Sequence, residues 1–457
     1  MKKYDIIVIG SGCGLIVAEA ASAKGWKTAL IEKDYIGGTC LNVGCIPSKM
    51  LISPADIIYE ISRSKRLGIE ASINNIDFQS IITRTAFTIK GYRNKLHRSL
   101  LRLPGVDLFE GVAKFSADYT IEVAGETIQA ERIVIACGTR PFIPDEALVG
   151  EEGFLTTDNL LELEQIPESI IIAGGGYVAC EYAHFFSAMG SRVVVLEMTD
   201  RLLSSEEPEI SMLVEKTLKK VADIHTSEKI EKIEKTKSGW NVATSAVQSG
   251  AKNNFDASHV LLALGRRSNT DLLDIANTAI ETDDKGYVVV DKYLETNKPG
   301  IYAIGDVNGV QMFRHAANYE ADIVFHNMAH GLSEEHKKVP VSYTAMPRAV
   351  FTRPQVAAVG LTEAEAKKHY KPISQITHFY ETAKGEAIQE RDGFIKVVFD
   401  EETRRILGCH IAGPQAPTLI QEAVNAMTLD GKPDLIHHSV HIHPALSEVI
   451  SLAFSGI

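Results

Sequence analysis

Two cysteines near the N-terminus have the spacing and surroundings of a reactive pair. Cys40 and Cys45 lie five positions apart in the segment 37–49, which begins with Gly-Gly and ends with Ile-Pro-Ser-Lys. A disulfide between them would close a small ring at the start of a helix, where the helix dipole lowers the pKa of a thiol and favours exchange. Taken alone, the pair is also compatible with a structural bond or two unrelated thiols. Because six cysteines are too few for a secreted disulfide scaffold, we interpret the close pair as redox-active.

A glycine-rich unit with the pattern of a dinucleotide-binding site precedes the cysteines. An apolar run ends in three alternating glycines, Gly10, Gly12 and Gly14, and a helical stretch follows. A second apolar run then ends at Glu32, which lies 22 residues after Gly10. Strand, glycine turn, helix, strand and acid is the pattern of a dinucleotide-binding unit, in which the backbone approaches a pyrophosphate at the helix N-terminus.

The same unit occurs a second time. An apolar run leads into Gly174 and Gly176, a helix begins near Tyr177, and the next strand ends at Glu197, 23 residues after Gly174. Two complete units predict two bound dinucleotides.

Composition excludes several classes of function. The 457 residues suffice for roughly three domains, and the net charge of -12 without a basic block argues against nucleic acid as a partner. No apolar run approaches the roughly 18 residues of a membrane span, and Asp5 with the following glycines breaks any secretory signal. We therefore expect a cytoplasmic protein that does not bind a membrane.

The histidines near the C-terminus raise the question of a metal site. Four of them lie at positions 437, 438, 441 and 443. Their spacing is irregular and no cysteine is close, so we predict no metal.

Together these features resemble the flavoprotein pyridine nucleotide-disulfide oxidoreductases. Nine segments match the family in order and span nearly the whole chain. They are the two glycine units, the segment with both cysteines, 136–138, 265–266, 304–306, 350–354, 406–413 and 443–448.

The resemblance implies an α/β fold with two Rossmann-like dinucleotide-binding domains and a C-terminal α+β dimerisation domain that makes a homodimer. The implied divisions are an FAD domain at 1–148, an NAD(P) domain at 149–268, a central segment at 269–336 that returns to the FAD domain, and an interface domain at 337–457. A long amphipathic helix is expected over 78–102.

The resemblance also assigns residues to the two cofactors. FAD is expected in the first unit and a nicotinamide dinucleotide in the second. For FAD the residues are Gly10, Gly12, Gly14, Glu32, Thr39, Gly138 and Asp306, and for the nicotinamide dinucleotide they are Gly174, Gly176, Tyr177, Glu197 and Gly265. Asp306 matches the aspartate that binds the ribityl chain, and Tyr177 matches the aromatic lid over the nicotinamide pocket.

For the reaction, the family places one thiol beside the flavin and the other on the substrate side. These correspond to Cys45 and Cys40. Lys49 matches the lysine near the flavin, with Glu181 as its expected partner. His443, donated by the other subunit and oriented by Glu448, would be the base for thiol exchange.

The nicotinamide cofactor can be inferred from charge. A carboxylate at Glu197 accepts hydrogen bonds from ribose hydroxyls and repels a 2′-phosphate. Relatives that use NADP carry arginines at the positions of Met198 and Ser204, and neither residue is basic here. Ala179 in place of Gly points weakly the other way. We predict NAD in preference to NADP.

The substrate is less constrained. The cysteine segment together with NAD resembles dihydrolipoamide dehydrogenase, which acts on lipoyl dithiols, whereas 183–190, 315–321 and the 443–446 segment resemble mycothione reductase. A reductase of a low-molecular-weight thiol disulfide, such as mycothione or glutathione disulfide, is therefore the alternative. Mercuric reductase is disfavoured because no cysteine pair precedes the final residue, Ile457. A catalytically silent flavin-binding assembly subunit is the alternative of another class, and the retention of both cysteines argues against it.

Overall fold

The computed structural model describes residues 1–145, 148–149, 153–330 and 337–455, and these fold into two compact units. The first unit consists of Met1–Ser48, Thr83–Phe142 and Arg266–Ser342. The second consists of Lys49–Ile82, Ile143–Gly265 and Tyr343–Ile457. The expected boundary at 336 lies outside the described residues, and the division into four segments stays a prediction.

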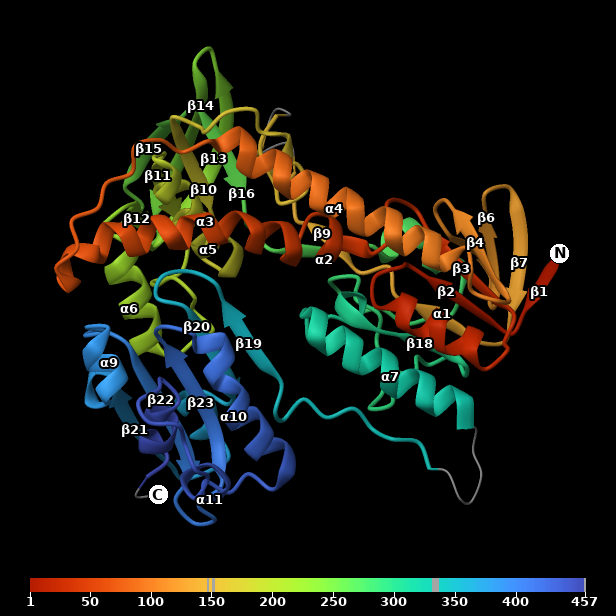
Figure 1. The fold of residues 1–457 in the computed structure, drawn as a ribbon. Coiled ribbons are helices and arrows are strands. Elements are labelled where there is room, and N and C mark those ends of the chain that lie inside the picture. The colour runs from red at the N-terminus through yellow and green to blue at the C-terminus, as the bar shows by residue number, and fades with distance from the viewer. Residues whose placement is uncertain (146–147, 150–152, 331–336, 456–457) are drawn as a thin grey trace. The chain divides into compact units, whose positions relative to one another are not determined.

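A five-stranded parallel sheet forms the centre of the first unit, in the order β18-β8-β2-β3-β4 (Figure 1). Its strands are β2 (Ile6–Ile9), β3 (Thr28–Glu32), β4 (Val106–Glu110), β8 (Ile133–Ile135) and β18 (Ile301–Ala303). Every residue of β2 and β3 is buried, as expected for parallel strands covered on both faces. Helices α1 (Gly14–Ala23) and α7 (Arg314–His330) pack against each other beside this sheet.

Two smaller sheets complete the strands of the first unit. One has the order β1-β7-β6-β5, and the other pairs β17 with β9. Their strands are β1 (Lys2–Tyr4), β5 (Lys114–Ala117), β6 (Thr120–Val123), β7 (Glu126–Ala130), β9 (Thr139–Pro141) and β17 (Arg266–Ser268).

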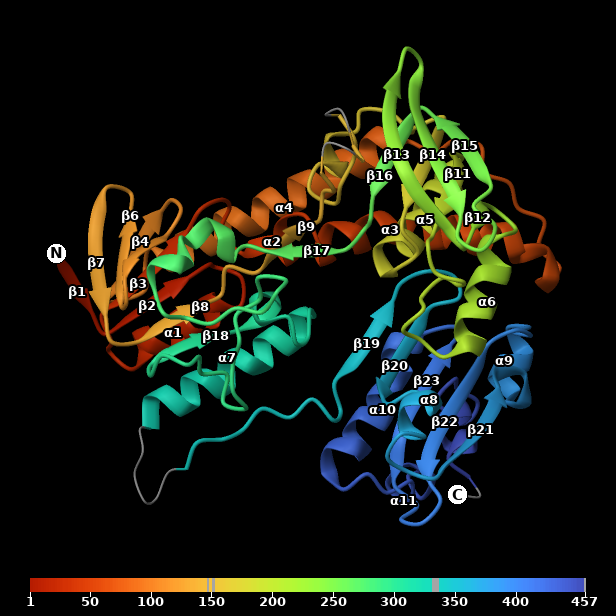
Figure 2. The same ribbon diagram turned by 180° about the vertical axis from the view of Figure 1, so that it is seen from behind.

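The second unit repeats the parallel arrangement and adds two antiparallel sheets (Figure 2). The parallel sheet has the order β12-β11-β10-β16 and contains β10 (Ser169–Ala173), β11 (Arg192–Leu196), β12 (Asp223–His225) and β16 (His259–Leu262). The first antiparallel sheet contains β13 (Glu228–Thr236), β14 (Gly239–Ala246) and β15 (Lys252–Ala257). The second has the order β19-β20-β23-β22-β21 and contains β19 (Pro347–Val350), β20 (Val356–Gly360), β21 (Pro372–His378), β22 (Phe394–Asp400) and β23 (Ile406–Ala412).

The remaining helices connect or cover these sheets. They are α2 (Gly38–Asn42), α3 (Cys45–Arg63), α4 (Phe78–Leu100), α5 (Tyr177–Met189), α6 (Pro208–Leu218), α8 (Glu363–Ala366), α9 (Ala383–Ala387), α10 (Ala416–Leu429), α11 (Asp434–His437) and α12 (Glu448–Ala453), with short 3-10 turns between them. Helix α4 confirms the amphipathic helix expected over 78–102. Among the described residues, no helix combines the length and the apolar character needed to cross a membrane.

The fold confirms the predicted α/β class with two Rossmann-like units. In each unit a buried strand leads into a glycine turn and a helix, and the next strand pairs with the first in parallel. Ile6 of β2 lies opposite Thr28 of β3, and Ser169 of β10 lies opposite Arg192 of β11. The internal repeat in the sequence is thus a repeat in structure.

Candidate active site

The two predicted redox cysteines lie together at the junction of two helices in the first unit. Cys40 is in α2 and is half-buried, whereas Cys45 is the first residue of α3 and is exposed. Both are thiols, and a hydrogen bond between their side chains, together with burial, raises the pKa of Cys40. The pair is therefore placed to form one disulfide, and Cys40 needs an external base to become a nucleophile at neutral pH.

Asn42 holds the segment that carries Cys40. Its side-chain amide donates to the carbonyl oxygens of Gly38 at 2.9 Å and of Tyr35 and Ile36 at 3.2 Å. Its carbonyl oxygen accepts from Arg93 of α4, whose guanidinium lies 3.6 Å from the ring centre of Tyr35. The sequence gives no signal for this arrangement, because an asparagine near glycines is equally typical of an ordinary turn.

Lys49 and Glu181 form an ion pair within the second unit. The ammonium group of Lys49, one helical turn after Cys45 in α3, lies 2.9 and 2.8 Å from the two carboxylate oxygens of Glu181. The Glu181 side chain is only 8% exposed, and it also accepts the backbone N–H of Phe351 at 2.9 Å. The ammonium group lies 4.6 Å from the ring centre of Phe351. Phe351 lies in the 350–354 segment, but the sequence gives it no role.

Replacing Lys49 with methionine is expected to lower the free energy of unfolding by about 2 kcal/mol. The change leaves a buried carboxylate with one neutral donor, but Lys49 is partly exposed, so the cost falls below the about 3–5 kcal/mol typical of fully buried pairs. The urea midpoint, followed by far-UV circular dichroism, measures the loss. Lys65→Met is the matched control, because Lys65 is 87% exposed and 3.9 Å from Glu70; an equal shift in both variants would contradict the prediction.

In the first glycine turn, two of the glycines pack so closely against neighbouring residues that a side chain would not fit. A Cβ on Gly10 would lie 2.3 Å from the carbonyl oxygen of Ala136, and one on Gly14 would lie 2.7 Å from Val8. On Gly12 it would meet no backbone or side-chain atom closer than 3.7 Å, where the guanidinium of Arg314 lies. The turn thus leaves bare backbone facing a positive charge, which fits a pyrophosphate group.

Arg314 was not singled out by the sequence, yet its charge also acts on Cys40. It begins α7, and its charge lowers the pKa of Cys40 against the larger effects of Cys45 and burial. A lone arginine in a helical stretch carries no sequence signal for this position, because only the packing of α7 beside the glycine turn brings it there.

The other predicted FAD residues lie at the end of a strand of the central sheet, after such a strand, or in α2. Glu32 is buried and accepts the backbone N–H and hydroxyl of Ser11 at 2.9 and 2.6 Å. Asp306 accepts the hydroxyl of Thr139 at 2.8 Å. Thr39 is exposed on α2, and Gly138 has a φ of +63° between β8 and β9.

The second glycine turn has the same close contacts as the first. A Cβ on Gly174 would lie 2.4 Å from the carbonyl oxygen of Ala263, whereas one on Gly176 would meet nothing within 4 Å. The carboxylate of Glu197 lies 2.8 Å from the place of a Cβ on Gly175 and accepts the N–H of Thr199 at 2.6 Å. An acid beside open backbone fits the ribose and pyrophosphate of a dinucleotide.

Tyr177 and Gly265 are the other two residues predicted to bind the nicotinamide dinucleotide. Tyr177 is the first residue of α5 and is half-buried. Gly265 has a φ of +108°, in the region that favours glycine, between the end of β16 and the start of β17.

His443 and Glu448 are in contact in the second unit. The Nδ1 atom of His443 lies 2.7 Å from a carboxylate oxygen of Glu448, whose other oxygen accepts the N–H of Ala445 at 2.9 Å. The hydrogen bond from His443, followed by that from Ala445, lowers the pKa of Glu448. His443 is 71% exposed, so its second ring nitrogen is accessible. An ionised carboxylate on one nitrogen and access to the other is the arrangement of an oriented base.

The other cysteines have environments that suppress reactivity. Burial raises the pKa of Cys13, Cys137 and Cys409 to about 12 and also raises that of Cys180. Three of the four are buried and Cys137 is half-buried. Across the described residues, no group of three or more histidine, cysteine or acidic side chains is arranged to hold a metal ion.

Comparisons with known proteins match the chain to one family over most of its length. Residues 4–321 match the model for pyridine nucleotide-disulphide oxidoreductases, and residues 346–454 match the model for their dimerisation domain. The chain is 34% identical over 466 residues to a mycothione reductase of Mycobacterium tuberculosis, covering 100% of both chains. It is also 34% identical over 455 residues to a dihydrolipoyl dehydrogenase of Chlamydia pneumoniae, covering 98% of this chain and 95% of the relative.

A solved structure is similar over the same length. The HOCl-induced flavoprotein disulfide reductase RclA from Escherichia coli, in its Cu(II) complex, matches 100% of this chain and 99% of its own with a TM-score of 0.86 at 27% identity. Members of the matched family use FAD and a nicotinamide cofactor, and the dimerisation domain implies a homodimer. The chain therefore belongs to the pyridine nucleotide-disulphide oxidoreductases, the family of flavoprotein enzymes that its paired thiols and doubled glycine turns predict.

Proposed function

We propose that this enzyme passes two electrons between NAD and a thiol substrate through FAD and the Cys40–Cys45 pair, and that it acts as a dihydrolipoamide dehydrogenase. The observation that carries the proposal is the contact between the two thiols at the start of α3. The ion pair of Lys49 and Glu181 one turn further along that helix supports it. When bound, FAD supplies the two-electron step between the nicotinamide and the disulfide.

The protein's residues carry the exchange with substrate. In the lipoyl direction a substrate thiolate attacks the Cys40 sulfur of the oxidised pair, which breaks the Cys40–Cys45 bond and releases Cys45 as a thiolate. The second substrate thiol then attacks the mixed disulfide, so that the substrate leaves as a disulfide and the enzyme keeps two thiols. Each attack needs a proton removed from a thiol, and His443 of the partner subunit, oriented by its Glu448, is the proposed acceptor.

The four-segment division, the homodimer through the C-terminal domain and a cytoplasmic location are parts of the same proposal. The match of 346–454 to the dimerisation domain supports the homodimer.

Glu197 is the proposed determinant of NAD preference. Glu197→Ser is expected to lower kcat/KM for NADH about tenfold, because ribose hydroxyls lose their acceptor, and to raise it for NADPH. Adding Met198→Arg is expected to raise kcat/KM for NADPH at least another tenfold, because the guanidinium can pair with the 2′-phosphate. Steady-state kinetics with both cofactors measure the change. Asp200→Asn removes the same charge from an exposed position nearby and is expected to alter neither value by more than about twofold; a similar switch there would refute the role of Glu197.

A reductase of a low-molecular-weight thiol disulfide is the second candidate. The full-length match to a mycothione reductase supports it as strongly as the match to a dihydrolipoyl dehydrogenase supports the first. Steady-state rates with lipoamide, dihydrolipoamide, glutathione disulfide and mycothione disulfide, each with NADH or NADPH where a reductant is needed, separate the two. The first candidate requires the highest kcat/KM with the lipoyl pair and NAD.

An anaerobic titration tests whether the chain is an enzyme at all. NADH should bleach the visible absorbance of the bound flavin and produce the long-wavelength absorbance of a thiolate beside it. Failure of both changes would favour a catalytically silent flavin-binding subunit.

A further inference from the structure

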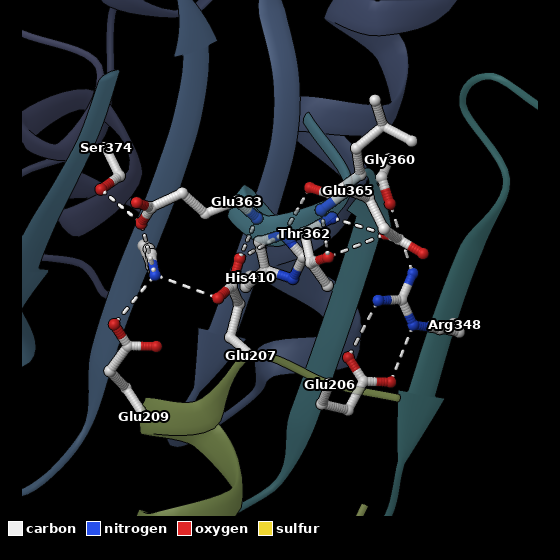
Figure 3. A network of polar contacts seen from close by, with 12 residues as sticks. Glu206, Glu207, Glu209, Arg348, Gly360, Thr362, Glu363, Glu365, Ser374 and His410 are labelled. Carbon is white, nitrogen blue, oxygen red and sulfur yellow. Dashed lines mark hydrogen bonds and ion pairs between the residues drawn. The ribbon is translucent and has the colours of Figure 1, made fainter. Parts of the chain in front are cut away.

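One buried carboxylate in the second unit joins the second glycine turn to the C-terminal sheet. Glu206 accepts the hydroxyl of Tyr177 at 2.9 Å. The same carboxylate is bound in a fork by Arg348 of β19, at 2.7 Å to one oxygen and 3.0 Å to the other (Figure 3). The Glu206 side chain is 0% exposed and that of Arg348 is 17% exposed. Such paired, charge-assisted hydrogen bonds are strong and fix geometry.

The backbone fixes the position of Glu206 relative to the glycine turn. The N–H of Glu206 donates to the carbonyl oxygen of Leu203 at 2.8 Å, and the N–H of Leu203 donates to that of Gly175 at 2.9 Å. Leu203 has a φ of +49°, which turns the chain sharply at this point. The carboxylate is therefore held at a constant place beside the start of α5.

The next residues anchor the same segment to the C-terminal sheet a second time. Lys396 of β22, 3% exposed, lies 3.0 Å from Glu207, 2.9 Å from Glu209 and 3.0 Å from Glu363. Figure 3 shows these acids beside the strands that carry Arg348 and His410. Arg348 and Lys396 hold the segment 206–209 in place. Glu206 therefore stays where it is if the side chain of Tyr177 moves away.

Tyr177 stands at the place where the second dinucleotide is proposed to enter. It follows Gly176, whose missing Cβ leaves open space, and it begins the helix whose N-terminus fits a pyrophosphate. Burial, followed by the charge of Glu206, raises the pKa of Tyr177 to about 12, so its hydroxyl remains a donor. The side chain of Ser205 also forms a hydrogen bond with this hydroxyl.

We propose that Glu206, itself held by Arg348, is a positioning residue that keeps the Tyr177 ring closed over the nicotinamide pocket, so that the dinucleotide must break the Tyr177–Glu206 hydrogen bond to bind. The inference rests on the proposed function, in which the second turn binds NAD. Because Arg348 belongs to the C-terminal domain and holds Glu206, that domain sets how tightly the second glycine turn binds the dinucleotide. The tether weakens binding and leaves hydride chemistry unaffected.

The test is the dissociation constant of NAD⁺ for the oxidised FAD-loaded full-length protein, followed by flavin fluorescence. Tyr177→Phe keeps the ring and removes the tether, so NAD⁺ is expected to bind about tenfold more tightly, the worth of one hydrogen bond to a charged group. Glu206→Gln keeps the shape of the acceptor and is expected to act in the same direction. In Glu206→Gln, which changes no residue assigned to the dinucleotide, KM for NADH should fall while kcat changes by less than about twofold, a split that general destabilisation would not produce.

A double-mutant cycle distinguishes tethering from two independent effects. If Glu206 acts through Tyr177, the variant with both changes should bind NAD⁺ no more tightly than Tyr177→Phe alone. Tyr182→Phe is the control, since Tyr182 lies on the same helix and is buried in the core. Unchanged or weaker binding in Tyr177→Phe, or additive effects in the double variant, would overturn the inference and leave the proposed function intact. Failure of the wild type to bind NAD⁺ or NADH would overturn both.

Discussion

Replacing Cys45 with serine is expected to reduce thiol–disulfide turnover by on the order of 10³-fold or more. With only Cys40 present, no internal disulfide can form to accept two electrons or to resolve a mixed disulfide with substrate. The glycine turn that is proposed to hold FAD does not involve Cys45, so the flavin should stay bound. Steady-state rates with lipoamide and dihydrolipoamide, with the visible absorbance of the purified protein as the measure of bound FAD, check the prediction.

Cys409→Ala is the matched control for this change. Cys409 is fully buried in β23, and its raised pKa makes it inert. Its replacement should leave turnover within about twofold of the wild type, at a cost of stability only. Full turnover in a Cys45→Ser protein that retains FAD would show that the pair does not carry the reaction.

Replacing His443 with glutamine is expected to lower turnover with the thiol substrate by about 10²–10⁴-fold, the usual effect of removing a general base. Bleaching of the flavin by NADH in a single turnover should change by less than about twofold, because that step needs no proton taken from a substrate thiol. Stopped-flow absorbance and steady-state assays on the same preparation separate the two half-reactions.

The residual activity of His443→Gln should depend on pH in a defined direction. The side-chain hydrogen bond between Cys40 and Cys45, followed by burial, raises the pKa of Cys40, so below that pKa its reactive thiolate is a small fraction that grows about tenfold per pH unit. In the direction where Cys40 is the attacking thiol, activity of the variant should rise with this slope from pH 7 to 9, whereas the wild type should vary less. A flat profile in the variant would contradict a role for His443 in deprotonating Cys40.

His441→Gln controls for a general effect of changing this histidine segment. His441 lies 2.8 Å from Glu422 rather than from Glu448, and its side chain is only 10% exposed. Its replacement is expected to leave both half-reactions within about threefold of the wild type.

The repeated glycine units and the reactive segment are accessible from sequence for a local reason. Buried parallel strands read as short apolar runs, and the turns after them favour glycine, because Gly10 has a φ of +101° and Gly174 a φ of +112°. These restrictions act within some 30 residues, so they leave a readable pattern in each unit. The same holds for the contact of His443 with Glu448, which are five residues apart.

The contacts that position the site depend on the tertiary structure. Arg93 reaches Asn42 across 51 residues, Arg348 reaches Glu206 across 142, and Phe351 reaches Glu181 across 170. In the sequence, Arg93, Arg348 and Glu206 do not differ from ordinary surface or core residues.

The sequence by itself thus determined the family, the α/β class and the two strand–glycine turn–helix units. The tertiary structure decided what holds the predicted site residues: the side chain of Asn42 holds the segment with the thiols, the backbone N–H of Phe351 holds Glu181, and the carboxylate of Glu206 holds the hydroxyl of Tyr177. The physical reason is that a glycine or a thiol is required by its own backbone geometry or chemistry, whereas a partner is required only by whatever the packed helices and strands bring within hydrogen-bonding distance.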